Sequence, residues 1–207
     1  RDTVITSFKI KHVDLDNVMF FRANLLQLES NIYYEKKIYK KAVSIVRSSL
    51  DIIKNLVIKD HDNIEWLDVF LGSNVLYFAI ELKRNNVSKV INYRSELELF
   101  IKHHKISSEG YEKLIALALF QINEKVGSYF FNNKNKLKAE ENYLKSLGLI
   151  SDPSVVRQNN YSSDLLSIVY YNLGSIYFDS GDFDKNIYYN LLSLKELERL
   201  LVSNSNV

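Results

Sequence analysis

The chain has 207 residues, of which 46% are hydrophobic and 25% charged, so it can bury a core and is not a disordered tail. Lys and Arg total 27 against 25 for Asp and Glu, and so small a positive excess argues against nucleic acid as the main partner. There is no cysteine, which excludes a disulfide framework, a thiolate zinc site and a cysteine nucleophile.

One proline and six glycines are too few for the turns of an all-β sandwich, and long stretches without either are typical of helices joined by short loops. Residues 1–15 could form part of a helix or an extended lead-in. After them we predict eight helices in chain order, over residues 17–34, 39–58, 64–83, 87–104, 108–131, 136–147, 162–179 and 184–202.

Neither a membrane span nor a signal peptide is expected. No stretch approaches the ~20 apolar residues that cross a bilayer, and the first residues lack the pattern of a cleaved leader. The sequence does not begin with Met. We therefore expect a single domain over residues 1–207, excised from a larger protein, and a cytoplasmic location.

An aliphatic-Gly-Ser triplet occurs three times, at residues 71–73, 126–128 and 173–175. The last two copies lie 47 positions apart, and the residues that follow them keep this register for some twenty positions. With Ser30 in the place of glycine, four small positions follow at spacings of 42, 55 and 47 residues, namely Ser30, Gly72, Gly127 and Gly174. We predict that each small residue lets the next helix approach closely.

The last unit shows the pattern most clearly. One helical face would carry Tyr170, Leu173, Gly174 and Tyr177. A turn at residues 181–183 and a second amphipathic helix follow, with apolar residues at Ile187, Leu191 and Leu194. This pair resembles the tetratricopeptide repeat, with the strongest match in residues 168–194. The resemblance implies an all-α fold, an α-α superhelix of about four tetratricopeptide-like helix pairs.

No set of residues points to catalysis, and we expect neither an enzyme, a metal site nor a cofactor. His103 and His104 are adjacent, so on a helix they point about 100° apart, whereas metal ligands from one helix usually lie four residues apart. No two glycines lie close enough for a phosphate-binding loop. The basic residues 36–41 fit a helix end better than a nucleic-acid site, so we expect no nucleic-acid binding through this domain.

The resemblance implies a curved array in which the first helix of each pair lines a concave face that holds a peptide or a partner's helix. Amide and hydroxyl groups there could hydrogen-bond a ligand backbone, and Tyr and Trp would supply apolar area. The positions next to the buried ones would form this face: Asn24, Gln27, Asn31 and Tyr34 in the first unit, Trp66, Ser73 and Tyr77 in the second, Gln121, Lys125, Ser128 and Asn132 in the third, and Tyr171, Asn172 and Ser175 in the last.

We therefore hypothesise a non-catalytic protein- or peptide-binding module, the sensing or scaffolding domain of a larger bacterial regulatory or signalling protein. In regulators of this repeat class, such a domain can be a peptide-pheromone receptor joined to a DNA-binding domain that regulates transcription. The alternative is a structural array whose outer faces mediate self-association, for instance as a homodimer, without a groove ligand.

Overall fold

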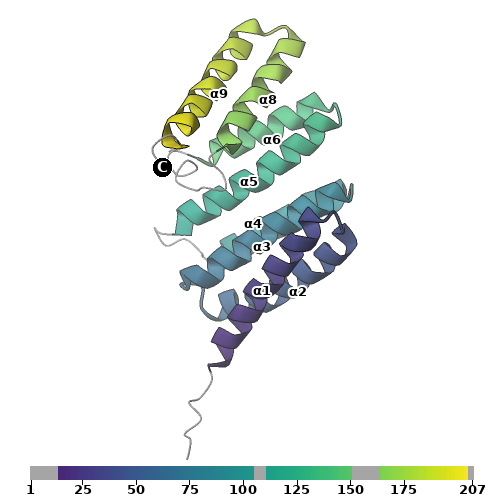
Figure 1. Ribbon diagram of the computed structural model, residues 1–207, viewed down its shortest axis with the longest axis vertical. Coiled ribbons are helices and arrows are strands. Elements are labelled where there is room, and N and C mark those ends of the chain that lie inside the picture. Colours follow the sequence, from purple (N-terminus) through teal and green to yellow (C-terminus); the bar gives the residue numbers. More distant parts are fainter. Residues whose placement is uncertain (1–13, 105–110, 151–163, 205–207) are drawn as a thin grey trace, which may run out of the picture.

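The computed structural model describes residues 14–104, 111–150 and 164–204, and within these ranges the chain forms helices and no strand. Figure 1 shows them stacked along the long axis of the molecule, with α1 and α2 at one end and α8 and α9 at the other. They are α1 (Leu15–Glu35), α2 (Tyr39–Lys59), α3 (Ile64–Lys83), α4 (Val87–His103), α5 (Tyr111–Asn132), α6 (Lys136–Gly148), α8 (Leu165–Ser180) and α9 (Phe183–Asn204).

The eight predicted helices are confirmed within the described ranges, and their ends there differ from the prediction by at most a turn. Residues 108–110 and 162–163, predicted to begin two of the helices, lie outside the described residues, as does the lead-in over 1–13. Several helices start at a polar cap that the sequence supplies. Asp14, Asn63 and Asn135 each accept a hydrogen bond from a backbone N–H of the first turn, at 3.1–3.2 Å.

Consecutive helices pack together, which makes the fold an all-α superhelical array of four pairs: α1–α2, α3–α4, α5–α6 and α8–α9. Each pair also contacts the next, because α3 packs on α1 and α2, α5 packs on α3, and α8 packs on α5 and α6. The first helices α1, α3, α5 and α8 are therefore successive neighbours along one side of the array. In the part of the chain that the structure describes, no helix is long and apolar enough to cross a membrane.

The same tight turn joins the two helices of every pair. One residue in each turn has a positive φ, namely Lys37 (60°), Asn85 (62°), Lys134 (60°) and Gly181 (79°). The N–H of the following residue donates to the carbonyl five residues earlier, at distances of 2.8–3.0 Å. This bond closes the first helix by satisfying one of its last carbonyl groups. Because these turn residues lie 48, 49 and 47 positions apart, they measure the repeat independently of any helix side chain.

The turns correct the predicted register of the second unit. Counting seven residues back from the turn residue gives Ser30, Gly127 and Gly174, as predicted, but in the second unit it gives Phe78 instead of Gly72. The predicted spacings of 42 and 55 residues thus become 48 and 49. The second unit thus has a large ring in the small position. In this unit α4 packs on α3 less closely than the other second helices pack on their partners. Aromatic rings fill the wider space, with Tyr93 lying 5.6 Å from Phe78.

The predicted glycine-sized contact between paired helices is present at two of the three glycines. A Cβ on Gly127 would lie 2.8 Å from the Tyr143 ring, and a Cβ on Gly174 would lie 2.7 Å from Asn190 Oδ1. Tyr143 and Asn190 each follow their glycine by sixteen residues, so the two contacts are equivalent. Gly72 differs, because its Cβ would meet the side chain of Gln27 on the preceding first helix.

A lysine recurs in the first turn of each second helix. It follows the large residue near the end of the first helix by eight positions, at Lys41, Lys89, Lys138 and Lys185. In three units the ammonium group lies 4.0–5.2 Å from the centre of an aromatic ring, a cation–π contact. In the second unit the ring is replaced by the fully buried Glu81, and Lys89 makes a 3.0 Å salt bridge with it.

Candidate functional site

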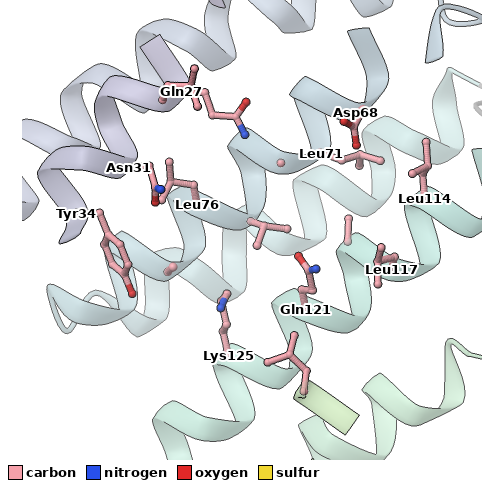
Figure 2. Close-up of a pocket in the computed structure, with 16 residues that line it drawn as sticks. Gln27, Asn31, Tyr34, Asp68, Leu71, Leu76, Leu114, Leu117, Gln121 and Lys125 are labelled. Atoms are coloured by element: carbon pink, nitrogen blue, oxygen red, sulfur yellow. The ribbon is translucent and has the colours of Figure 1, made fainter. Parts of the chain in front are cut away.

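A groove runs along the side of the array where α1, α3 and α5 are neighbours. It consists of two hollows, of about 640 Å³ and 510 Å³, that share Tyr34, Ala79 and Lys125. Figure 2 shows Gln27 and Asn31 on one wall of the larger hollow and Gln121 and Lys125 on the other. We call this feature the α1–α3–α5 groove.

The groove opens over α3, which carries small or apolar residues where α1 carries polar ones. The turn register makes Asn24, Gln27, Asn31 and Tyr34 of α1 equivalent to Gly72, Val75, Ala79 and Leu82 of α3. All four of these α3 residues line the hollows. With Leu71, Leu76, Leu117 and Ala118 they form an apolar floor between amide-bearing walls. Such a groove can bury apolar side chains while the amides at its rim pair with polar groups.

A buried acid lies in the smaller hollow. Glu124 is 5% exposed, and its Oε1 accepts a 2.7 Å hydrogen bond from Ser128 Oγ. Burial raises the pKa of Glu124, and the charge of Lys125 and the Ser128 hydrogen bond only partly offset that effect. Burial likewise raises the pKa of Asp68, which lines the larger hollow. Glu124 is therefore poorly solvated, and a cationic group near it would be favoured, whereas Asp68 remains exposed.

Tyr34 stands where the two hollows meet. Burial raises the pKa of its hydroxyl, and the charges of Tyr39, Glu35 and Glu124 raise it further. The hydroxyl is therefore neutral at ordinary pH and can donate a hydrogen bond into the groove. Its ring lies 5.9 Å from that of Tyr39 on α2, a contact that helps to hold it at the rim.

Seven of the predicted site residues line the groove. They come from the first and third units and are Gln27, Asn31, Tyr34, Gln121, Lys125, Ser128 and Asn132. Asn24 lies about one turn before Gln27 on α1 and does not line either hollow. The structure thus brings together the residues predicted for two of the four units.

The residues predicted in the second unit lie in the core. Trp66, Ser73 and Tyr77 are buried, and Ser73 Oγ lies 3.2 Å from Ser49 Oγ of α2. The difference comes from the predicted register. Placing the small position of the second unit at Gly72 rather than Phe78 shifts the predicted face by six residues along the helix. Six residues rotate the predicted face by about 120°, from the groove to the preceding pair.

The last unit contributes Leu165, at the start of α8, to the larger hollow, but none of the three residues predicted there lines the groove. Asn172 is buried, and its Nδ2 donates a 2.7 Å hydrogen bond to the hydroxyl of Tyr143. Tyr171 is exposed on α8, and Ser175 Oγ donates to the Tyr171 carbonyl at 3.0 Å. Asn172 therefore supports the packing of α8 on α6, and a contact between its amide and a groove ligand is not available.

Sequence reasoning missed the residues that form the floor and the acids. Val75, Ala79 and Glu124 do not stand out as residue types, and the register error placed the predicted site on the buried face of α3 instead of the face that lines the groove. The equal spacing of the turns is the signal that would have found them, since the Asn85-Asn86 turn aligns with Gly181-Asp182. Asn is one of the few residues that adopts a positive φ readily.

Among the described residues, no group of three or more His, Asp or Glu side chains could hold a metal ion. Comparisons of the chain with models of protein families, with curated proteins and with solved structures find no match. The case for function therefore depends on the groove and on the surfaces of the array.

Proposed function

We propose that the chain is a non-catalytic binding module whose α1–α3–α5 groove holds a segment of a peptide or protein. The observation that carries the proposal is the continuous groove itself, with an apolar floor on α3 and polar side chains on α1 and α5. The amides of Gln27, Asn31 and Gln121 can pair with the backbone of an extended segment, whose polar groups are costly to bury without partners. The apolar floor can take one or two side chains of that segment.

The poorly solvated side chain of Glu124 favours a ligand that carries a positive charge. A basic side chain or a free amino group of the peptide, placed beside Glu124, would replace lost solvation with an opposite charge. We therefore propose that the bound segment carries apolar residues next to a basic group. The tetratricopeptide resemblance supports the same role, because arrays of that kind hold extended segments on the side lined by their first helices. As part of a larger regulatory protein, such a module would act in sensing or scaffolding.

A blocking variant tests the groove. Ala79 lines both hollows, so Ala79→Arg fills the groove with a long side chain. Ser95→Arg adds the same charge on the exposed surface of α4 and serves as the matched control. Immobilised protein is incubated with a pool of random octapeptides, and the retained peptides are identified by mass spectrometry.

We expect the parent and Ser95→Arg to retain a common set of peptides that are apolar and basic, and Ala79→Arg to lose that set. Retention of the same peptides by Ala79→Arg would show that they bind elsewhere. Retention of acidic peptides in preference to basic ones would refute the role given to Glu124. Circular dichroism of all three proteins checks that the helices are intact.

A further inference from the structure

The outer face of α1 is apolar and uncovered. It presents a row of exposed residues that includes Phe21 (61% exposed), Leu25 (66%) and Ile32 (53%). A shallow apolar hollow of about 430 Å³ lies on this face, lined in part by Val18 and Leu25. Isolated exposed apolar residues are ordinary, but a continuous row along a helix is typical of a surface that binds something.

The repeat shows what kind of surface covers these positions elsewhere in the chain. The turn register makes Phe21, Leu25 and Ile32 equivalent to Val69, Ser73 and Ile80 of α3, which are all buried. The difference between the two helices is that α3 packs against the preceding pair, chiefly against α2, whereas the described chain has no pair before α1. The uncovered face of α1 therefore has the shape of a site for a second helix of this array.

The opposite end of the array also has an uncovered apolar face, on α9. On α9, Leu194 (52% exposed) and Leu201 (72%) are uncovered, as is Leu197 between them. Their equivalents on α2 are buried beneath the next pair: Leu50 (6% exposed), Ile53 (0%) and Val57 (0%). Both α2 and α9 pack on their own first helix, so the burial of the α2 residues comes from α3. The uncovered face of α9 is thus the surface on which a first helix of the array would sit.

We infer that separate copies of this chain bind end to end, with α9 of one copy against α1 of the next. In that contact α9 takes the position toward α1 that α2 takes toward α3 within one chain. Leu194, Leu197 and Leu201 would cover Phe21, Leu25 and Ile32, so that both rows leave water together. The contact joins different surfaces, and so it can repeat and build open chains of copies rather than stopping at a dimer. The contact uses the outer face of α1, which shares only Leu28 with the lining of the α1–α3–α5 groove, and it holds whether or not that groove binds a peptide.

Two charge variants test the contact in the full 207-residue chain. Leu25→Glu places a charge in the α1 face, and Leu194→Glu places one in the α9 face. Leu137→Glu is the control, since Leu137 is even more exposed but lies on α6, away from both ends. Sedimentation velocity measures the mass of each protein over a wide range of concentration. All three side chains are largely exposed, so the folded pairs should tolerate the changes.

We expect the parent and Leu137→Glu to grow beyond a dimer as the concentration rises, and each end variant to stay monomeric. An equal mixture of Leu25→Glu and Leu194→Glu should form a dimer and nothing larger, because one intact α9 face meets one intact α1 face. A parent that is monomeric throughout overturns the inference. Dimerisation of Leu25→Glu alone, through two α9 faces, or of Leu194→Glu alone, through two α1 faces, overturns it equally.

A cross-linking measurement does not depend on the charge variants. The chain has no cysteine, so single cysteines can be introduced as Phe21→Cys and Leu197→Cys in separate proteins. A short bifunctional thiol reagent should join the two variants to each other and neither variant to itself. Cross-links formed only within one variant would show a symmetric contact and refute the end-to-end arrangement.

Discussion

Gly127 is the position where the packing of the array leaves least room. A Cβ there would lie 2.8 Å from two atoms of the Tyr143 ring, and real Cβ atoms almost never approach closer than 3.0 Å. The ring cannot move aside easily. It is fully buried, and its hydroxyl is held by Asn172 Nδ2 at 2.7 Å and by Ser128 Oγ at 3.1 Å. We therefore expect Gly127→Ala to be destabilising.

The magnitude follows from two opposing effects. Overpacking a well-filled site typically costs about 1–3 kcal/mol, because neighbouring groups must shift. Replacing glycine by alanine inside a helix recovers up to about 1 kcal/mol. The free energy of unfolding of Gly127→Ala should thus fall by about 1–2 kcal/mol. In a chain of this length that corresponds to a fall in Tm of a few degrees.

Gly174 occupies the equivalent position in the last unit, so Gly174→Ala is a close comparison for Gly127→Ala. A Cβ at Gly174 would also meet a side chain at 2.7 Å, but that neighbour is the amide of the half-buried Asn190, which can rotate away. We expect Gly174→Ala to change the free energy of unfolding by less than about 0.5 kcal/mol. Gly148, near the end of α6, has no heavy atom within 4 Å of its Cβ position, so Gly148→Ala reports the gain in helix propensity alone.

Urea unfolding followed by circular dichroism measures all three variants, with an unchanged slope showing that the midpoints can be compared. We expect the urea midpoint of Gly127→Ala to lie below that of the parent, and the midpoints of Gly174→Ala and Gly148→Ala to lie at or above it. If Gly127→Ala and Gly174→Ala unfold at the same urea concentration, the rigidity assigned to Tyr143 is refuted.

Three further predictions concern single side chains. Because burial raises the pKa of Glu124, folding stability should fall as the pH rises from the ordinary value of 4.5 through that raised pKa, and Glu124→Gln should flatten this part of the stability profile. Asn172→Ala should lower the free energy of unfolding by about 1–2 kcal/mol, since it removes a buried partner of Tyr143, whereas Tyr171→Ala should leave it unchanged in the same urea titration. The pKa of Glu81 is raised by burial but lowered overall by its hydrogen bonds and neighbouring cations, so its stabilisation is present above pH 4.5 and lost as the pH falls through the lowered pKa. Glu81→Gln should cost roughly 2–3 kcal/mol at neutral pH and remove that acid-side loss.

The helices were predictable because the signals that set them are local. Apolar residues recur at helical spacing between short breaks, so each helix is found within the described ranges with its ends there close to the right residue. The pairing of helices was predictable for the same reason, since short turns require antiparallel neighbours. Ser30, Gly127 and Gly174 also take equivalent positions, as the sequence indicated.

The register of the second unit was not predictable from glycine, because there the repeat keeps its turn but changes its packing residues. Phe78 replaces the small residue and Glu81 replaces the aromatic one, so the side chains that identify the unit are missing. Arg47, Arg84 and Lys89 surround the buried carboxylate of Glu81 and make it acceptable in the place of a ring. These partners come from three segments of the chain, and only the folded array brings them together.

The departures of this second unit are also what create the candidate site. If α3 followed the pattern of α1, polar side chains would stand at positions 72, 75 and 79 and fill the space that now forms the groove floor. Local departures from an otherwise consistent repeat are expected where a surface has a function to perform. The uncovered rows on α1 and α9 are the opposite case, because there the repeat is followed and no neighbouring pair lies among the described residues. The chain thus carries two kinds of surface, a groove where the repeat changes and exposed apolar rows on α1 and α9 where the repeat continues.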